Sequence, residues 1–251
     1  MSTRHAMTIP WAGGTVSTRS AGIANERDRR APLLVLVATA VLLAFQYAAR
    51  ADTLGVFSTH RGWAPMTGTP LPPYLHLVAA ALLLGVLPVI AARRLTGLSL
   101  RQLGLGVGRW RAGLALVVIG APVAILAGHT AAQSIAMRAV YPLDPVMSQG
   151  FLPLAAAQFL YFGAWEVLFR GVLLFGLKSR VGDGTANIIQ TALSVTAHFG
   201  RAINETFAAF PAGLLFGWLG LRLRSVWYVA ALHWLVGISM DAFILSRAGA
   251  L

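Results

Sequence analysis

The chain has no cysteine and few charged residues. The absence of cysteine from its 251 residues excludes disulfide bonds, zinc–thiolate sites and thiol catalysis. Only 11% of the residues are charged, whereas a soluble domain carries about 25%. A soluble fold could not hide the apolar surface, because 57% of the residues are hydrophobic and the mean hydropathy is +0.70. The composition therefore favours a membrane protein, whose apolar side chains are solvated by lipid.

The sequence motifs of several common enzyme classes are also missing. The chain has no H-E-x-x-H, no G-x-S-x-G and no G-x-x-x-x-G-K-[ST]. These motifs belong to zinc peptidases, to α/β-hydrolases and to nucleotide-binding phosphate loops, respectively. Any enzymatic activity of this chain therefore needs a different set of residues.

The sequence does contain a series of long apolar segments. A helix needs about 20 residues to cross about 30 Å of hydrocarbon. We therefore predict an all-α membrane bundle of about seven transmembrane helices, in which the short and fairly polar fifth segment is shielded by its neighbours. The segments are 32–49, 71–92, 112–137, 151–177, 186–199, 206–221 and 225–246.

Residues 1–30 contain five arginines and no apolar run, so we predict a disordered cytoplasmic tail there. The Arg29–Arg30 pair in front of an apolar stretch also fits a twin-arginine signal. We prefer an uncleaved first span, because the stretch is long for a signal peptide and more spans follow. The predicted organisation is then this tail followed by one membrane-embedded domain over residues 31–251.

The basic residues give the chain a formal net charge of +12, but their placement does not indicate nucleic-acid binding. They lie in short loops between apolar segments, where they indicate membrane topology. With the N-terminus inside, 14 of the 20 Lys and Arg residues fall on the inner side and five on the outer side, and Arg170 lies within a span. The positive-inside rule thus predicts a cytoplasmic N-terminus and an outer C-terminus.

Three of the eight acidic residues, Glu166, Glu205 and Asp241, lie in or next to apolar segments. An ionisable group in hydrocarbon costs about 2.5–3.5 kcal/mol on insertion scales, so each is a candidate functional residue. Glu166 and Arg170 are four residues apart and share one face of a helix. The structural alternative is a pair of charges that offsets its own cost of burial.

Two histidines lie at a similar depth to Glu166. At a rise of 1.5 Å per residue, Glu166 lies about 16 Å, His198 about 17 Å and His233 about 12 Å from the inner ends of their spans. Glu205 follows His198 by seven residues, and Asp241 follows His233 by eight. These two acids are possible additional site residues. Pairing with a nearby arginine, or helix capping, is the structural alternative for both.

One glutamate and two histidines allow two kinds of hydrolysis. The carboxylate can act as general base on a water while the histidines share the proton and stabilise an oxyanion. Alternatively, Glu166, His198 and His233 can bind a metal such as zinc, which lowers the pKa of its bound water. The residues alone leave both chemistries open.

Residues 151–241 resemble the CPBP family of CAAX-processing and bacteriocin-processing intramembrane endopeptidases, and the family-like core extends over about 151–245. The family pattern is E-E-x-x-x-R on one helix, F-x-x-x-H on a second, and H-x-x-x-N or H-x-x-x-D on a later one. The corresponding stretches of this chain are 165–171, 194–198 and 233–237.

The resemblance implies a glutamate-type peptidase with no cofactor, although a divalent metal such as zinc stays an alternative. In this interpretation Glu166 is the general base and activates water together with His198. His233 supports the oxyanion, and Arg170 orients Glu166. Glu205 is the second candidate for the general base, because this chain lacks one acidic residue of the family pattern.

The chain departs from the family pattern at two positions. Trp165 replaces the first glutamate, which the family uses as general base, and Gly237 replaces the final asparagine, an oxyanion partner. We interpret the chain as a divergent branch with a reassigned base, in which Glu205 and Asp241 supply the extra acids.

The predicted function is hydrolysis of a peptide bond in or near the membrane, in a membrane-inserted or lipidated protein. The predicted partners are that substrate and the bilayer, and the predicted location is a bacterial plasma (inner) membrane. A first alternative is a catalytically inactive relative that acts as an accessory or immunity-type binding protein. A second is a proton-coupled transporter, although the paired broken helices expected of one are absent from the sequence pattern.

Overall fold

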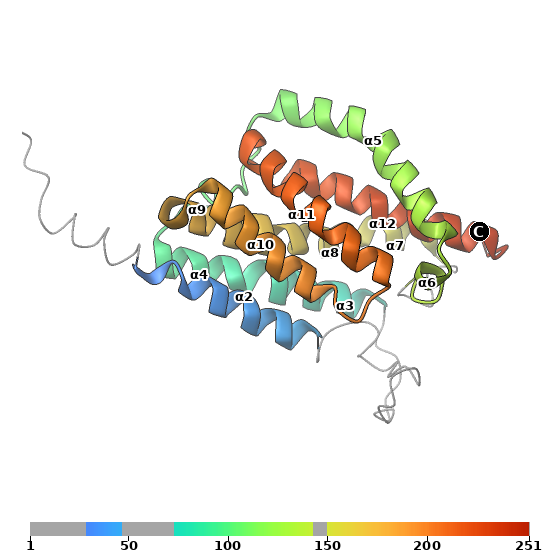
Figure 1. Ribbon diagram of the computed structural model, residues 1–251, viewed down its shortest axis with the longest axis horizontal. Helices are drawn as coiled ribbons and strands as arrows, with labels where there is room; N and C mark the ends of the chain where they lie inside the picture. The colour runs from blue at the N-terminus through green and yellow to red at the C-terminus, as the bar shows by residue number, and fades with distance from the viewer. Residues whose placement is uncertain (1–28, 47–72, 143–149, 251) are drawn as a thin grey trace, which may run out of the picture.

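The computed structural model describes residues 29–46, 73–142 and 150–250, and helices are the only regular elements within these ranges. The predicted all-α fold class is therefore confirmed. The predicted tail lies outside the described residues, except for Arg29 and Arg30. The helices lie side by side in one bundle, with α5 arching over one side of it (Figure 1).

The elements follow one another as a series of straight and locally distorted helices. In chain order they are α2 (Leu33–Ala44), α3 (Pro73–Ala80), η3 (Ala81–Val86), α4 (Leu87–Thr96), α5 (Trp110–Gln133), α6 (Ile135–Arg138), α7 (Phe151–Ala157), α8 (Phe159–Glu166), η5 (Val167–Phe175), α9 (Gly176–Val181), α10 (Asp183–Ala197), α11 (Ile203–Leu223) and α12 (Trp227–Arg247).

Five helices of the described chain are long and apolar enough to cross a membrane, each from one of the predicted segments. The first predicted segment forms α2, which is apolar but has only 12 residues. The last residues of this segment, 47–49, lie outside the described ranges. The fifth forms α10, which has 15 residues. The total of about seven spans stays a prediction. The five are Leu77–Thr96, Trp110–Gln133, Phe151–Val181, Ile203–Leu223 and Trp227–Arg247.

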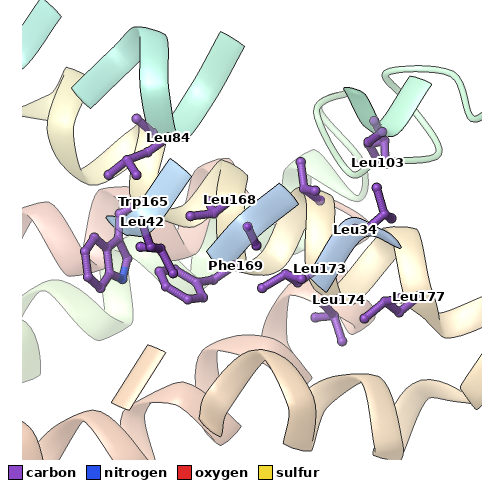
Figure 2. Packing of buried hydrophobic residues seen from close by; sticks show 14 of the residues in the cluster. Leu34, Leu42, Leu84, Leu103, Trp165, Leu168, Phe169, Leu173, Leu174 and Leu177 are labelled. Atoms are coloured by element: carbon purple, nitrogen blue, oxygen red, sulfur yellow. The ribbon is translucent and has the colours of Figure 1, made fainter. Parts of the chain in front are cut away.

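The helix Phe151–Val181 lies at the centre of the bundle. Of its most apolar stretch of 18 residues, 83% is buried inside the protein, whereas the corresponding stretches of the other four spans are 17–39% buried. Leu168 and Phe169 from this helix are fully buried and pack with Leu34 of α2 and Leu84 of η3 (Figure 2). The central helix is therefore held by protein rather than by lipid, which allows it to carry polar side chains.

Part of this central helix, η5, has π-helical hydrogen bonding. Such segments are rare and occur frequently at functional sites. This one begins directly after Glu166 and contains Arg170, so the predicted ion pair spans the point where the helix changes its winding.

Helices α10 and α11 pack closely through two glycines of α11. A Cβ atom at Gly213 would lie 2.7 Å from Thr191 Cγ2, and one at Gly217 would overlap the amide oxygen of Asn187. The close approach lets Gln190 donate hydrogen bonds to Asn187 Oδ1, at 2.7 Å, and to the carbonyl oxygen of Gly213, at 3.0 Å. These bonds satisfy the amide N–H group of Gln190 inside the bundle, whereas its Oε1 has no partner within the described residues. The pairing of the two helices sets the position of the turn at residues 198–202.

Candidate active site

A cavity of about 520 Å³ lies between α5, α8, α10, α11 and α12. Its wall is mostly apolar and includes several alanines of α11. The polar groups that line it come from segments far apart in the sequence. They include Tyr141, Arg170, His198, Asn204, Glu205 and His233.

On the α12 side of the cavity, Glu166 holds both Arg170 and His233. Arg170 Nη1 donates to Glu166 Oε1 at 3.0 Å, and His233 Nδ1 donates to the same oxygen at 2.7 Å. Glu166 is fully buried and Arg170 nearly so, whereas the His233 side chain is 25% exposed. A carboxylate that fixes Nδ1 sets the tautomer and direction of the ring, so Nε2 of His233 is the nitrogen left for the cavity.

On the opposite side, His198 and Glu205 face each other across the turn between α10 and α11. His198 Nδ1 donates to the carbonyl oxygen of Ser194 at 2.6 Å, which leaves Nε2 as the acceptor nitrogen. This Nε2 lies 3.8 Å from Glu205 Oε1. Tyr141, in the segment after α6, donates its hydroxyl to the same Glu205 oxygen at 2.6 Å.

The predicted site residues therefore fall into three groups. Glu166 and Arg170 form a buried pair that orients His233, and His198 is paired with Glu205. Asp241 is buried in α12 but is not among the residues that line the cavity. Glu166 is also not among them, so its predicted role as general base has no direct support from its placement.

Trp165 occupies the position of the missing family glutamate and belongs to the hydrophobic core. Its side chain is 4% exposed and packs against Phe169 and His198, with ring centroids 4.8 and 5.1 Å apart. It also lines the cavity. The indole thus supplies one wall of the site and supports the ring of His198.

Gly237 occupies the position of the missing family asparagine, and the ring of Phe162 fills the space beside it. A Cβ atom at Gly237 would overlap Phe162 Cζ. The same ring packs edge-on against His233 at a centroid distance of 4.9 Å. A side chain at position 237 is therefore incompatible with the present packing.

Sequence reasoning did not identify Tyr141 or Phe162. Phe162 precedes Glu166 by four residues, so helical periodicity contained a signal for it. Tyr141 follows a four-residue helix and lies outside the long apolar segments, so no spacing rule connected it to Glu205, 64 residues later.

The alternative metal set of Glu166, His198 and His233 does not have the placement of a ligand set. Across the described residues, no group of three or more His, Asp or Glu side chains is arranged to hold a metal ion. Glu166 Oε1 and both Nδ1 atoms are already engaged in hydrogen bonds. The expectation of a cofactor-free enzyme stays a prediction.

Five helices suited to crossing a bilayer and a shared cavity lined by acid and histidine side chains define a class: a multi-pass helical membrane protein with an internal cavity that carries ionisable side chains. Residues 145–239 match the family model described as Rce1-like, type II CAAX prenyl endopeptidase. The match confirms the predicted resemblance to the CPBP family, which is a family of proteases. It covers 95 of the 251 residues, and Tyr141 and Asp241 lie outside it.

The comparisons gave no further relatives. Neither the search of curated proteins nor the search of solved structures found a match for this chain.

Proposed function

We propose that the chain is an intramembrane endopeptidase that hydrolyses a peptide bond in another membrane-inserted or lipidated protein. One observation carries the proposal. Two histidines from different helices are each fixed through Nδ1, and both line one cavity together with Glu205. A purely structural pair of histidines has no need of a shared cavity, whereas a hydrolase needs room for a water and a peptide. We expect a bacterial plasma membrane as its location.

In the proposed reaction, a water bound between Glu205 and His198 is the nucleophile. Glu205 and His198 take a proton from the water as its oxygen bonds to the peptide carbonyl carbon. The carbon–nitrogen bond then breaks, and the proton passes to the leaving amine nitrogen. His233, protonated and held by Glu166, donates Nε2–H to the oxygen that becomes negatively charged.

This assignment gives the role of general base to Glu205, the second candidate of the sequence prediction. Glu205 lines the cavity next to His198, whereas Glu166 is fully buried behind His233. Glu166 then does not contact the water itself. Its carboxylate orients the imidazole of His233. The two assignments predict different effects of replacing each glutamate.

The test uses the full chain in phosphatidylethanolamine–phosphatidylglycerol vesicles with two internally quenched peptide probes. One ends in an S-farnesylated cysteine followed by three residues, the form that CAAX processing takes, and the other is an unmodified apolar peptide. We expect His198→Ala and Glu205→Gln to lower cleavage by about 10²-fold or more, as expected for loss of a general base. We expect His233→Ala to lower it by about 10²-fold through loss of an oxyanion donor.

The matched control is His129→Ala. His129 is an exposed histidine of α5 that is not among the cavity residues, so its replacement should leave cleavage unchanged. If Glu166→Gln abolishes cleavage and Glu205→Gln does not, Glu166 is the base. If the folded wild-type chain cleaves neither probe faster than a His198→Ala, His233→Ala double variant, the proposal fails in favour of a binding protein without peptidase activity.

A further inference from the structure

We propose that Tyr141 is a positioning residue of this site, which holds the carboxylate of Glu205 in place for the activation of water. The inference rests on the proposed function and extends it to a residue outside the matched family region. Four observations carry it: a short hydrogen bond, a free carboxylate oxygen, an anchored ring and a phenol that stays protonated.

The hydrogen bond connects Tyr141 to the acid that faces His198. The Tyr141 hydroxyl donates to Glu205 Oε1 at 2.6 Å, and this oxygen is also the one that lies 3.8 Å from His198 Nε2. The phenol therefore fixes the oxygen that faces the histidine. A hydrogen bond to an ionised carboxylate is among the stronger hydrogen bonds of proteins.

The other oxygen of Glu205 has no donor among the described residues. Glu205 Oε2 is buried and has no hydrogen-bond partner within the described part of the chain, and Glu205 lines the cavity. A buried carboxylate oxygen without a donor is costly, so it would gain a partner if the carboxylate turned toward a water in the cavity. Tyr141 on one oxygen and a water on the other would give the carboxylate both a fixed direction and a proton to accept.

The ring of Tyr141 is anchored by packing. It contacts a cluster of buried residues from α5, α6, α12 and the turn before α11, and its backbone N–H donates to the carbonyl oxygen of Met137 at 2.9 Å. The hydroxyl therefore cannot swing far from Glu205. The buried residues of the cluster are Ala132, Met137, Ala202, Met240 and Ile244.

The phenol remains a donor throughout the useful pH range. Burial raises the pKa of Tyr141 well above its ordinary value of 10.0, and the negative charge of Glu205 raises it further against the opposing effect of Arg201. The titratable and charged groups around Glu205 are Tyr141, His198 at the end of α10, Arg201 in the following turn, and His233 on α12 across the cavity. Tyr141 donates a short hydrogen bond to the carboxylate.

The experiment compares Tyr141→Phe with the wild-type chain on whichever probe the wild type cleaves. We expect kcat to fall about tenfold or more, because a hydrogen bond to a charged group is lost, while KM changes little. The acidic limb of the kcat/KM profile should move to higher pH by about one unit, since the ionised carboxylate loses its donor. A purely structural role would lower the amount of folded protein without moving the pH profile.

The matched control is Tyr228→Phe, which removes a hydroxyl that donates to the carbonyl oxygen of Val107 at 2.7 Å, outside the cavity. Its rate and pH profile should equal those of the wild type. In a Glu205→Gln background, Tyr141→Phe should have no further effect on the residual rate, because no carboxylate remains to be positioned. If Tyr141→Phe folds poorly, Glu205→Asp serves as a second variant. The shorter side chain keeps the negative charge but withdraws it from the phenol, so the same fall in kcat and the same shift of the pH profile are expected.

The outcomes separate this inference from the proposed function. If the wild type cleaves a probe and Tyr141→Phe matches it in kcat and in pH profile, the role of Tyr141 is wrong while the peptidase stands. If the wild type cleaves neither probe, the peptidase and the role of Tyr141 fall together.

Discussion

At the scale of single residues, both positions that depart from the family pattern are closely packed by neighbouring side chains. Trp165 is packed into the core, and Phe162 fills the space in front of Gly237. Restoring either family residue therefore means displacing a large ring. The interpretation of the chain as a divergent branch with a reassigned base stays a prediction.

We predict that Gly237→Asn, which restores the family residue, destabilises the protein and lowers peptidase activity. The new side chain would collide with Phe162, and overpacking a filled core costs about 1–3 kcal/mol. Thermal unfolding in detergent micelles measures the change. Gly184→Asn is the matched control, because a Cβ atom at Gly184 meets nothing within 4 Å. Unchanged stability of Gly237→Asn would show that Phe162 moves away at little cost.

The sequence predicted which side chains to examine but not how they pair. Depth along the spans placed Glu166, His198 and His233 at one level, and the structure gives Glu166 and His233 a direct contact. Depth contains no information on rotation about the helix axis. The contact between Glu205 and Tyr141 depends on that rotation and on the course of a short connector, so spacing alone could not predict it.

At the scale of helices, the pairing of α10 with α11 determines the separation of His198 from Glu205. We predict that Gly217→Ala pushes the helices apart, because its methyl group would overlap the Asn187 side chain. The expected result is a loss of stability of about 1–3 kcal/mol, as for other overpacked sites, with a loss of cleavage. Thermal unfolding and the probe assay measure the two effects.

The control for this prediction lies one turn further along the same helix. At Gly220 the nearest neighbours of an added Cβ atom are 3.8 and 3.9 Å away, which is ordinary contact. Gly220→Ala should therefore be neutral, or more stable by up to about 1 kcal/mol through helix propensity. Equal effects of the two replacements would show that close packing of α10 against α11 is not what holds the site.

Hydropathy predicted the helical elements well and their irregularities poorly. Each predicted apolar segment overlaps a described helix, because hydrocarbon length and apolar runs determine where helices form. The interruption at Gln158 and the π-helical winding of η5 were not predicted. Both occur in the central helix, where packing against neighbouring helices decides the geometry. The π-helical segment η3, in the span Leu77–Thr96, was not predicted either.

At the scale of the whole molecule, the charges indicate which end of the cavity faces the cytoplasm. In the described residues, the end of the bundle where α4 stops and α5 starts carries a high density of arginines, including Arg93, Arg94, Arg109 and Arg111. The turn between α10 and α11 lies at the opposite end (Figure 1). Tyr141 and Glu205, at the rim of the cavity, belong to this opposite end.

We predict that this rim end faces away from the cytoplasm, as the positive-inside rule requires. The chain contains no cysteine, so a single introduced cysteine is the only thiol of the protein that a maleimide can label. In intact bacterial cells, a membrane-impermeant maleimide should label Ser246→Cys at the end of α12 and should label Ser99→Cys, between α4 and α5, only after the cells are permeabilised. Both serines are exposed, so burial does not favour one site. The reverse labelling pattern would contradict the orientation, whereas the expected one places the Tyr141–Glu205 end of the cavity on the non-cytoplasmic side.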